Sequence, residues 1–352
     1  MATQRATEAT GTEFSSGLSA ELLREEQERE LPPGTGPYRL AWRRLRRNRG
    51  ALLFGAIFLL IVVACLLAPV YSHDIAHTGP NDEHITEQIK IGGKSEYVIN
   101  TIGIPIGPTW HSRFFLGADP GGRDVAVRLL YGGRNSLEVG AVATLITMIL
   151  AAIIGILAGY HRGAVDGVLS RALDVIWAYP VYILGVALGV SLAVGGINLG
   201  AINVKGNSLF VPAAIIGLVY IPYVAKPIRG QVLGLREREF VDAARAQGLS
   251  HLRVMASEIL PNVASTIIVF IPLMLANAIL LEAGLSYLGA GVQPPNPSWG
   301  TMISDGVRNI PAAIHLVLVP GLMLVIAVLS VNVFGDGVRD ALDPRAKVRI
   351  GR

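Results

Sequence analysis

Among the apolar stretches of this 352-residue chain that are predicted to span a membrane, four contain no Asp, Glu, Lys or Arg. They cover residues 51–73, 206–225, 259–281 and 309–335. Because an α-helix rises 1.5 Å per residue, about 20 apolar residues cross the roughly 30 Å of hydrocarbon in a bilayer. Two further stretches, 135–160 and 172–204, carry one carboxylate each, Glu138 and Asp174. The sequence therefore predicts an all-α polytopic membrane protein with six transmembrane helices.

The composition agrees with this class. Hydrophobic residues make up 51% of the chain and charged residues only 16%, whereas about a quarter of the residues of soluble domains are charged. The single cysteine, Cys65, lies inside an apolar stretch. It excludes an internal disulfide and leaves too few thiolates for a zinc or iron–sulfur site.

The basic residues predict the orientation. With the N-terminus inside, the predicted cytoplasmic segments hold 22 Lys and Arg residues and the predicted external segments hold 8. The positive-inside rule then places both termini in the cytoplasm and the chain in the plasma or inner membrane. The orientation of the first helix is predicted most firmly, because a cluster of five arginines precedes it: Arg43, Arg44, Arg46, Arg47 and Arg49.

Val62-Val63-Ala64-Cys65 loosely resembles a lipoprotein cleavage site, which would make the first apolar stretch a signal peptide. We expect a retained helix instead, because the polar leader is about fifty residues long and the apolar run continues to Tyr71.

The predicted organisation follows from these spans. Residues 1–35 are polar and are expected to form a disordered cytoplasmic tail. The remaining segments are a basic segment with the first helix (36–71), a long external loop (72–134), a five-helix core (135–338) and a cytoplasmic C-terminal tail (339–352).

The segment 236–262 is predicted to be cytoplasmic, is about half apolar and is too charged to span the membrane. Phe240, Ala244 and Gly248 recur at a spacing of four with Val241 beside them, which predicts a helix with one buried face. Gly248 permits a bend, and Pro261 is expected to end the second half before the next span. Periodicity alone is equally typical of a basic helix that rests on anionic headgroups.

A motif favours another interpretation. Asp242-Ala243-Ala244 is followed by Gly248 and, further on, by Leu260-Pro261. This pattern resembles the "EAA" loop of the permease subunits of binding-protein-dependent ABC importers, with Asp242 in place of the usual Glu. Glu258 also stands where many members have a neutral residue or histidine. In that family the loop is the coupling helix that docks on the ATPase subunit.

Further motifs resemble the dipeptide/oligopeptide permease family, C-type subunit. They occur in the family's order and extend from about Arg39 to Arg349. The matching residues are 116–119, 122–124, 129–134, 136–137, 159–160, 166, 171–174, 180, 235–239, 282–289, 291–295, 297–300 and 335–344.

The resemblance implies a type I ABC importer permease fold and a transport subunit that is not itself an enzyme. It also implies three kinds of protein partner: a homologous second permease, two ATPase subunits that hold ATP and Mg²⁺, and an extracytoplasmic binding protein. The implied solutes are dipeptides or oligopeptides, with nickel chelates, opines and oligosaccharides as alternatives. No cofactor and no nucleic acid is expected on this chain, which contacts membrane lipid.

The predicted external loop 286–311 contains Pro294, Pro295 and Trp299, a stiff and poorly helical stretch with an aromatic residue suited to a membrane interface. It is a candidate lid over the pathway or contact for the binding protein. A plain connection between two helices is an equally good interpretation.

Ionisable residues border the apolar stretches and are candidate functional groups, because charge in hydrocarbon is costly. Each of them lies near a predicted membrane surface, where pairing or snorkelling is the simpler role. They are Glu138, Asp174, Lys226, Glu282 and His315. Since none lies mid-span, an ion-driven secondary carrier is disfavoured.

Residues 91–95, Ile-Gly-Gly-Lys-Ser, resemble the end of a phosphate-binding loop, but Gln88 occupies the place of the first glycine. The histidines of the external loop, His73, His77, His84 and His111, are scattered, and we expect them to be solvated rather than to bind metal. No nucleophile–base pair is evident that would support an intramembrane enzyme.

Overall fold

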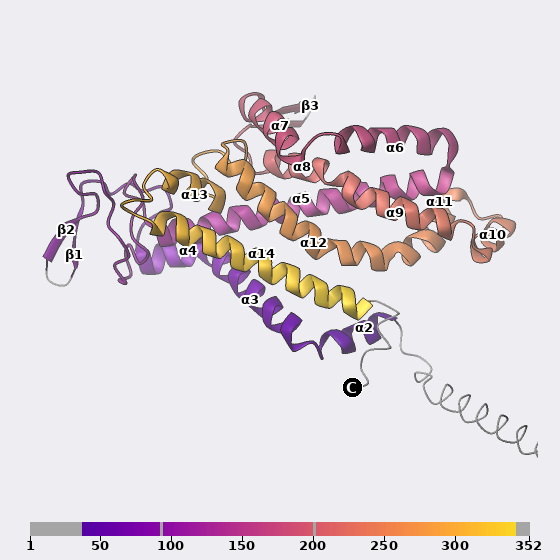
Figure 1. Cartoon of the computed structure of the whole chain (residues 1–352), viewed down its shortest axis with the longest axis horizontal. Coiled ribbons are helices and arrows are strands. Elements are labelled where there is room, and N and C mark those ends of the chain that lie inside the picture. Colours follow the sequence, from indigo (N-terminus) through magenta and orange to yellow (C-terminus); the bar gives the residue numbers. More distant parts are fainter. Residues whose placement is uncertain (1–36, 92–93, 200–201, 343–352) are drawn as a thin grey trace, which may run out of the picture.

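One helix of 37 residues, α5 (Val125–His161), runs through the molecule, and other helices pack along it (Figure 1). The computed structural model describes residues 37–91, 94–199 and 202–342. A carboxylate oxygen of Asp124 accepts hydrogen bonds from the backbone N–H groups of Ala126 and Val127. Because the first N–H groups of a helix have no partner within it, this cap fixes where α5 begins.

The other described elements follow in chain order. Before α5 lie α2 (Pro37–Leu45), α3 (Arg49–Leu66), α4 (Ala68–Val70), η1 (Tyr71–Ala76), β1 (Gln88–Ile91) and β2 (Lys94–Tyr97). After it come α6 (Gly163–Trp177), α7 (Val181–Gly195), β3 (Ile197–Leu199), β4 (Ile202–Val204), α8 (Phe210–Val219), α9 (Ile221–Leu235), α10 (Glu239–Ala246), α11 (His251–Val254), η2 (Met255–Ile259), α12 (Leu260–Tyr287), α13 (Trp299–Val307) and α14 (His315–Leu342).

Glycines let α5 and α9 approach closely. A Cβ atom on Gly155 would overlap the carbonyl oxygen of Ala225, and one on Gly159 would overlap the side chain of Val232. Small residues at helix contacts in membranes allow backbones to meet at short range. This contact lies in the largest cluster of buried apolar side chains, which also holds Ile228.

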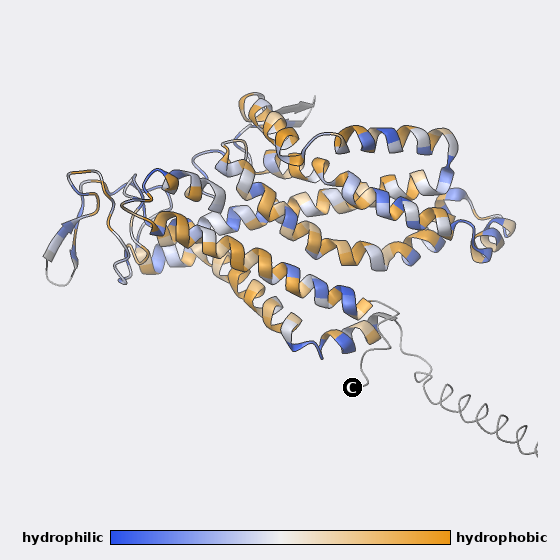
Figure 2. Ribbon diagram, viewed as in Figure 1, coloured by the Kyte–Doolittle hydropathy of each residue, from blue (hydrophilic) through white to orange (hydrophobic). Residues whose placement is uncertain are grey.

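The lengths and hydropathy of the helices agree with six spans. Four described helices are long and apolar enough to cross a bilayer: α3, α5, the continuous helix His251–Tyr287 and α14. The pairs α6–α7 and α8–α9 meet the same test together, which gives six spans if each bent pair counts once. Figure 2 shows apolar residues along most of α3 and α14.

The prediction of one helix over 172–204 was wrong. The α6 helix begins at Gly163 and ends at Trp177, and α7 then departs at 88°. Pro180 has no N–H to donate and disfavours the helical conformation at Tyr179, so the helix breaks there. The strands β3 and β4 follow α7 as an antiparallel hairpin.

The predicted span 206–225 is divided between α8 and α9, with a bend of 41° at Tyr220. Pro222 lies in the first turn of α9, where its missing N–H is tolerated.

Two predicted boundaries also moved. Residues 125–134 of the predicted external loop belong to α5, and residues 339–342 of the predicted C-terminal tail belong to α14. The predicted tail 1–35 and residues 343–352 lie outside the described residues.

The described residues between 72 and 124 form a structured segment. The β1 and β2 strands pair antiparallel, and the guanidinium group of Arg113 donates to the carboxylate of Glu87. Gly92 and Gly93 lie outside the described residues, but the strands beside them form a hairpin. A phosphate-binding loop joins a strand to a helix, so the local fold differs from that motif.

The expectation of a poorly helical stretch over 286–311 was wrong for its second half, which forms α13. Ser298 and Thr301 cap this helix reciprocally through side chain and backbone. Trp299 is fully buried, and its indole N–H donates to the carbonyl oxygen of Leu129. Its ring fills the core between α5 and α13 and does not face a membrane surface.

Candidate functional site

The segment 236–262 lies at the end of the bundle opposite the β1–β2 hairpin (Figure 1). We call the end that carries residues 236–254 the α10 end. The opposite end, with residues 72–124 and 289–311, is the α13 end.

A glycine ends α10. Gly248 has φ +83°, the left-handed region that favours glycine. The N–H of Gly248 donates to the carbonyl of Arg245 at 2.9 Å, and the N–H of Leu249 donates to that of Ala244 at 3.2 Å. These bonds form a Schellman motif. The bend predicted at Gly248 is therefore confirmed, and the positive φ of this glycine is its cause.

The buried face of α10 is narrower than predicted. Val241 and Ala244 pack into the main apolar cluster together with Val254 and Met255. Phe240, which the sequence placed on the same face, is 39% exposed. It lies one position from Val241, and neighbouring residues of a helix are about 100° apart around its axis.

Exposed groups on α10 and α11 form a surface suited to another protein. The side chain of Asp242 is 69% exposed, Ala243 is exposed, and Leu252 of α11 is 75% exposed. With Phe240 they place one carboxylate among apolar groups. Such a surface can accept hydrogen bonds from a partner and fill an apolar groove on it.

Tyr160, in the last turn of α5, holds this surface in place. Its hydroxyl lies 3.1 Å from Nδ1 of His251 and accepts a hydrogen bond from Nε of Arg245 at 3.3 Å. The carbonyl oxygen of Tyr160 accepts one from Arg236 at 2.5 Å. The guanidinium group of Arg245 also lies 5.0 Å from the centroid of the Tyr160 ring.

In the sequence, Tyr160 was notable only as part of a motif match with Gly159. A tyrosine at the end of an apolar run is a weak signal, since its partners Arg236, Arg245 and His251 lie 76, 85 and 91 residues away.

Leu260 and Pro261, the end of the predicted motif, lie at the start of α12, apart from α10. Both are exposed. The prediction that Pro261 ends a helix was wrong, because His251–Tyr287 is continuous. The π-helical turn η2 precedes Pro261, and the N–H of Leu260 donates to the carbonyl of Met255. This wider turn accommodates a residue that has no N–H.

Two of the predicted ionisable residues pair with each other. Nζ of Lys226 lies 2.6 Å from Asp174. Glu282, which was expected to reach water or a partner, is instead fully buried and accepts a hydrogen bond from Ser286 at 2.6 Å. Glu138 is exposed.

A second ion pair joins α6 to α9. The guanidinium group of Arg229 donates to both carboxylate oxygens of Asp166, at 2.5 and 2.7 Å. Bidentate pairs of this kind are strong and directional. Arg162, between α5 and α6, pairs with Glu237 at the same end of the bundle.

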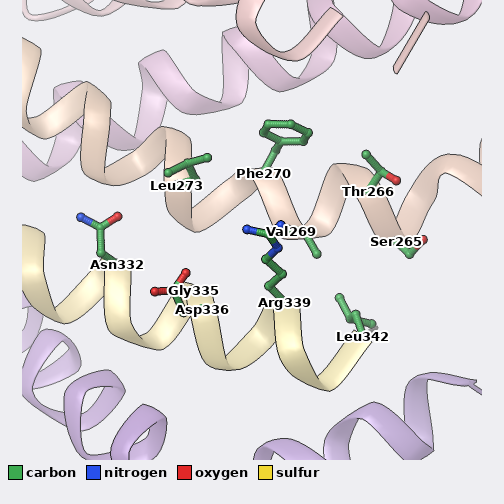
Figure 3. A pocket seen from close by; sticks show the side chains of 10 residues that line it. All are labelled: Ser265, Thr266, Val269, Phe270, Leu273, Asn332, Gly335, Asp336, Arg339 and Leu342. Carbon is green, nitrogen blue, oxygen red and sulfur yellow. The ribbon is translucent and has the colours of Figure 1, made fainter. Parts of the chain in front are cut away.

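A groove of about 400 Å³ opens between α12 and α14 (Figure 3). Apolar side chains such as Phe270 and Leu273 line it together with polar ones. Arg339 reaches from α14 toward α12, with Asp336 on the turn before it. The groove is therefore polar on its α14 side.

At the α13 end, Pro294 and Pro295 are exposed and line a cavity of about 420 Å³. The cavity also contains Arg123 and Asp305, which lie 3.6 Å apart. Trp299, predicted with the two prolines, is buried beneath this surface and cannot contact a partner directly.

The chain matches two family models. The model described as "Binding-protein-dependent transport system inner membrane component" covers residues 151–348. The chain belongs to this family. The model "N-terminal TM domain of oligopeptide transport permease C" covers residues 36–86 of the permease. Both matches confirm the resemblance inferred from the sequence motifs.

The permease is similar to two transport permeases, and each match covers most of both sequences. One is the dipeptide transport system permease protein DppC of Alkalihalophilus pseudofirmus, 34% identical over 312 residues, with 88% of this chain and 91% of the relative covered. Another is the glutathione transport system permease protein GsiD of Pectobacterium atrosepticum, 29% identical over 320 residues, with 88% and 92% covered.

Among solved structures, the MetNI methionine ABC transporter in an inward-facing conformation matches with a TM-score of 0.49 and 17% identity. The match covers 61% of the permease and 96% of the MetNI chain.

Proposed function

We propose that this permease is one of two transmembrane subunits of an ABC importer and that the surface on α10 and α11 docks on the ATPase subunits. The observation that carries this proposal is the link from the exposed Asp242, which lies 3.5 Å from Arg245, through Arg245 to Tyr160 of α5. A displacement of the docking surface then moves the longest helix of the bundle directly.

The partners follow from the family. A homologous second permease completes the membrane pore, two ATPase subunits bind ATP and Mg²⁺, and a binding protein delivers the solute from outside. This chain performs no chemistry itself. The α10 end faces the cytoplasm and the α13 end faces outward, as the excess of Lys and Arg in the segments around α10 supports.

Peptides are the proposed solute. Relatives named for dipeptide and glutathione transport support this class, since both solutes are short peptides. The prolines at the α13 end, Pro294 and Pro295, are the proposed contact for the binding protein, and their exposure supports this role.

Reconstitution tests the coupling role. In proteoliposomes that contain the permease with its second permease, ATPases and binding protein, peptide uptake requires ATP. The double variant Phe240→Ala, Asp242→Ala is expected to lower both the yield of co-purified ATPase and the uptake. Gly248→Trp or deletion of residues 242–261 is expected to abolish uptake.

The matched control is Ile102→Ala, which truncates an apolar residue that is 82% exposed at the opposite end. Uptake at the control rate by the α10 variants would refute the coupling role. Uptake by this chain alone in response to an ion gradient would refute the importer.

A further inference from the structure

One of the two bent spans, α8–α9, has its break next to the middle of α5. The hydroxyl of Thr147 donates to the carbonyl oxygen of Gly217 at 2.8 Å, and Gly155 lies against Ala225. The α8–α9 break at Tyr220 is thus level with residues between 147 and 155, well inside the apolar stretch 135–160. Irregular backbone at membrane depth is stable only where it is buried in protein or lines a water-filled cavity.

Aromatic residues gather at both breaks. The rings of Trp177, at the end of α6, and Tyr223, in the first turn of α9, stack at 4.9 Å and 13°. Tyr223 meets Tyr220 edge to face at 5.6 Å. On α7, just after the other break, the ring of Tyr182 packs against Gly284, where a Cβ atom would overlap it. We call Trp177, Tyr223, Tyr220 and Tyr182 the aromatic track.

Two members of the track, Tyr220 and Tyr182, lie on one face of α12. The hydroxyl of Tyr220 donates to the carbonyl oxygen of Asn277 at 3.4 Å. Gly284, beneath Tyr182, lies two helical turns from Asn277 toward the α13 end, so both are on one face. In the other direction, Leu273 and Phe270 continue this face into the groove between α12 and α14 (Figure 3).

Two members of the track are uncovered within this chain, and the other two, Tyr220 and Tyr223, are half-buried. Trp177 and Tyr182 are 44% and 45% exposed. A tyrosine hydroxyl in hydrocarbon loses its hydrogen bonds with water, which costs free energy. Lipid is therefore a poor neighbour for this face, whereas an aqueous path shared with a second subunit satisfies it.

An ion pair adjoins the track. The ammonium group of Lys226 lies 4.1 Å from the centroid of the Trp177 ring and 2.6 Å from Asp174. Their side chains are 34% and 62% exposed. Charges that border a membrane span are expensive in hydrocarbon, so this exposed pair favours water or protein as its neighbour. The pair offers one charge of each sign to a zwitterion.

We propose that the aromatic track is this chain's part of the translocation path and that it carries peptides, with Lys226 and Asp174 meeting the terminal carboxylate and ammonium groups. The inference rests on the proposed function. Ring faces and phenol hydroxyls contact side chains and peptide amides with little selectivity, which suits a path for peptides of varied sequence. Secondary transporters, a different class, also form their substrate sites at discontinuous helices.

Photo-crosslinking in the complete reconstituted complex tests the track. A benzophenone amino acid replaces Tyr182 or Tyr223. The replacement keeps an aromatic ring at either position. The control replaces Leu59 of α3, which is 61% exposed and lies outside the track. Radiolabelled dipeptide is supplied with the binding protein. Crosslinks to peptide at 182 and 223 that require ATP, without crosslinks at 59, are the expected result.

Transport by variants provides the second readout. We expect Trp177→Ala and Tyr223→Ala to lower peptide uptake about threefold to tenfold, the effect of losing one aromatic contact. The milder Tyr223→Phe keeps the ring and is expected to transport close to the native rate. Lys226→Met is expected to reduce uptake of a free dipeptide more than that of its C-terminal amide.

Two results have distinct meanings. If the native complex imports no peptide, the proposed function fails, and this inference fails with it. If the native complex imports peptide while positions 182 and 223 crosslink only to lipid and Trp177→Ala transports normally, the path lies elsewhere and the proposed function stands.

Discussion

The hydroxyl of Tyr160 lies 3.1 Å from Nδ1 of His251, although the two residues are 91 positions apart in the chain. The contact joins the last turn of α5 to the first residue of α11 and also includes Arg245. It is a direct connection between the exposed surface on α10 and α11 and the longest helix of the bundle.

Tyr160→Phe removes the hydroxyl from this connection and keeps the ring. We expect the complex to assemble and hydrolyse ATP, with peptide uptake per ATP about fivefold lower, because a net hydrogen bond contributes about 1 kcal/mol. Uptake and ATPase activity measured on the same proteoliposomes check this ratio. Tyr97→Phe, at an exposed tyrosine of the β2 strand, is the control. An unchanged ratio in Tyr160→Phe contradicts the connection.

Gly248→Ala places a Cβ atom on a residue with φ +83°. No atom lies within 4 Å of that Cβ, so the cost is conformational and amounts to about 1–2 kcal/mol. We expect weaker retention of the ATPase subunits during purification in detergent. Gly234→Ala on α9 adds the same atom at an open helical position and is expected to retain them fully. Equal retention by both variants would show that the bend does not matter for docking.

We expect the stability of the protein to depend on pH through Asp124, at the start of α5. Burial raises the pKa of its carboxyl group, although hydrogen bonds from the N–H groups of Phe114, Val127 and Ala126 lower it. The native state thus holds the proton more tightly than the unfolded chain. Stability from this group is greatest below the ordinary pKa of 3.8 and falls as the pH rises through the native pKa.

Asp124→Asn removes that titration and turns an amide NH₂ group toward the N–H of Phe114. Thermal unfolding in detergent across the acidic range is expected to show the Tm advantage of the wild type narrowing as the pH rises. Glu83→Gln changes an exposed carboxyl of the same segment and is the control. A difference in Tm that stays constant with pH would contradict the assignment.

The single cysteine makes the orientation measurable. Cys65 is 2% exposed, so the native permease is expected to react slowly with a membrane-impermeant maleimide. Gly248→Cys is expected to react in inside-out vesicles and not in right-side-out cells. Ile102→Cys, 82% exposed at the α13 end, is expected to show the opposite pattern. Labelling of position 248 from outside would invert the topology.

The sequence by itself determined which segments are apolar enough to cross a bilayer, where the basic residues gather and which family the motifs belong to. These properties are local, since length and hydropathy decide partition into hydrocarbon. The bend at Gly248 was also predictable, because glycine is the residue that adopts a positive φ without steric cost.

Only the tertiary structure decided how those segments meet. Pro180 could be read as a breaker, but its 88° turn and the stacking of Trp177 on Tyr223 depend on α9 lying beside α6. Trp299 is a residue type suited to a membrane interface. It is buried instead, because α13 packs on α5. Burial and hydrogen bonding between distant residues depend on how the helices pack together, which hydropathy along the chain does not encode.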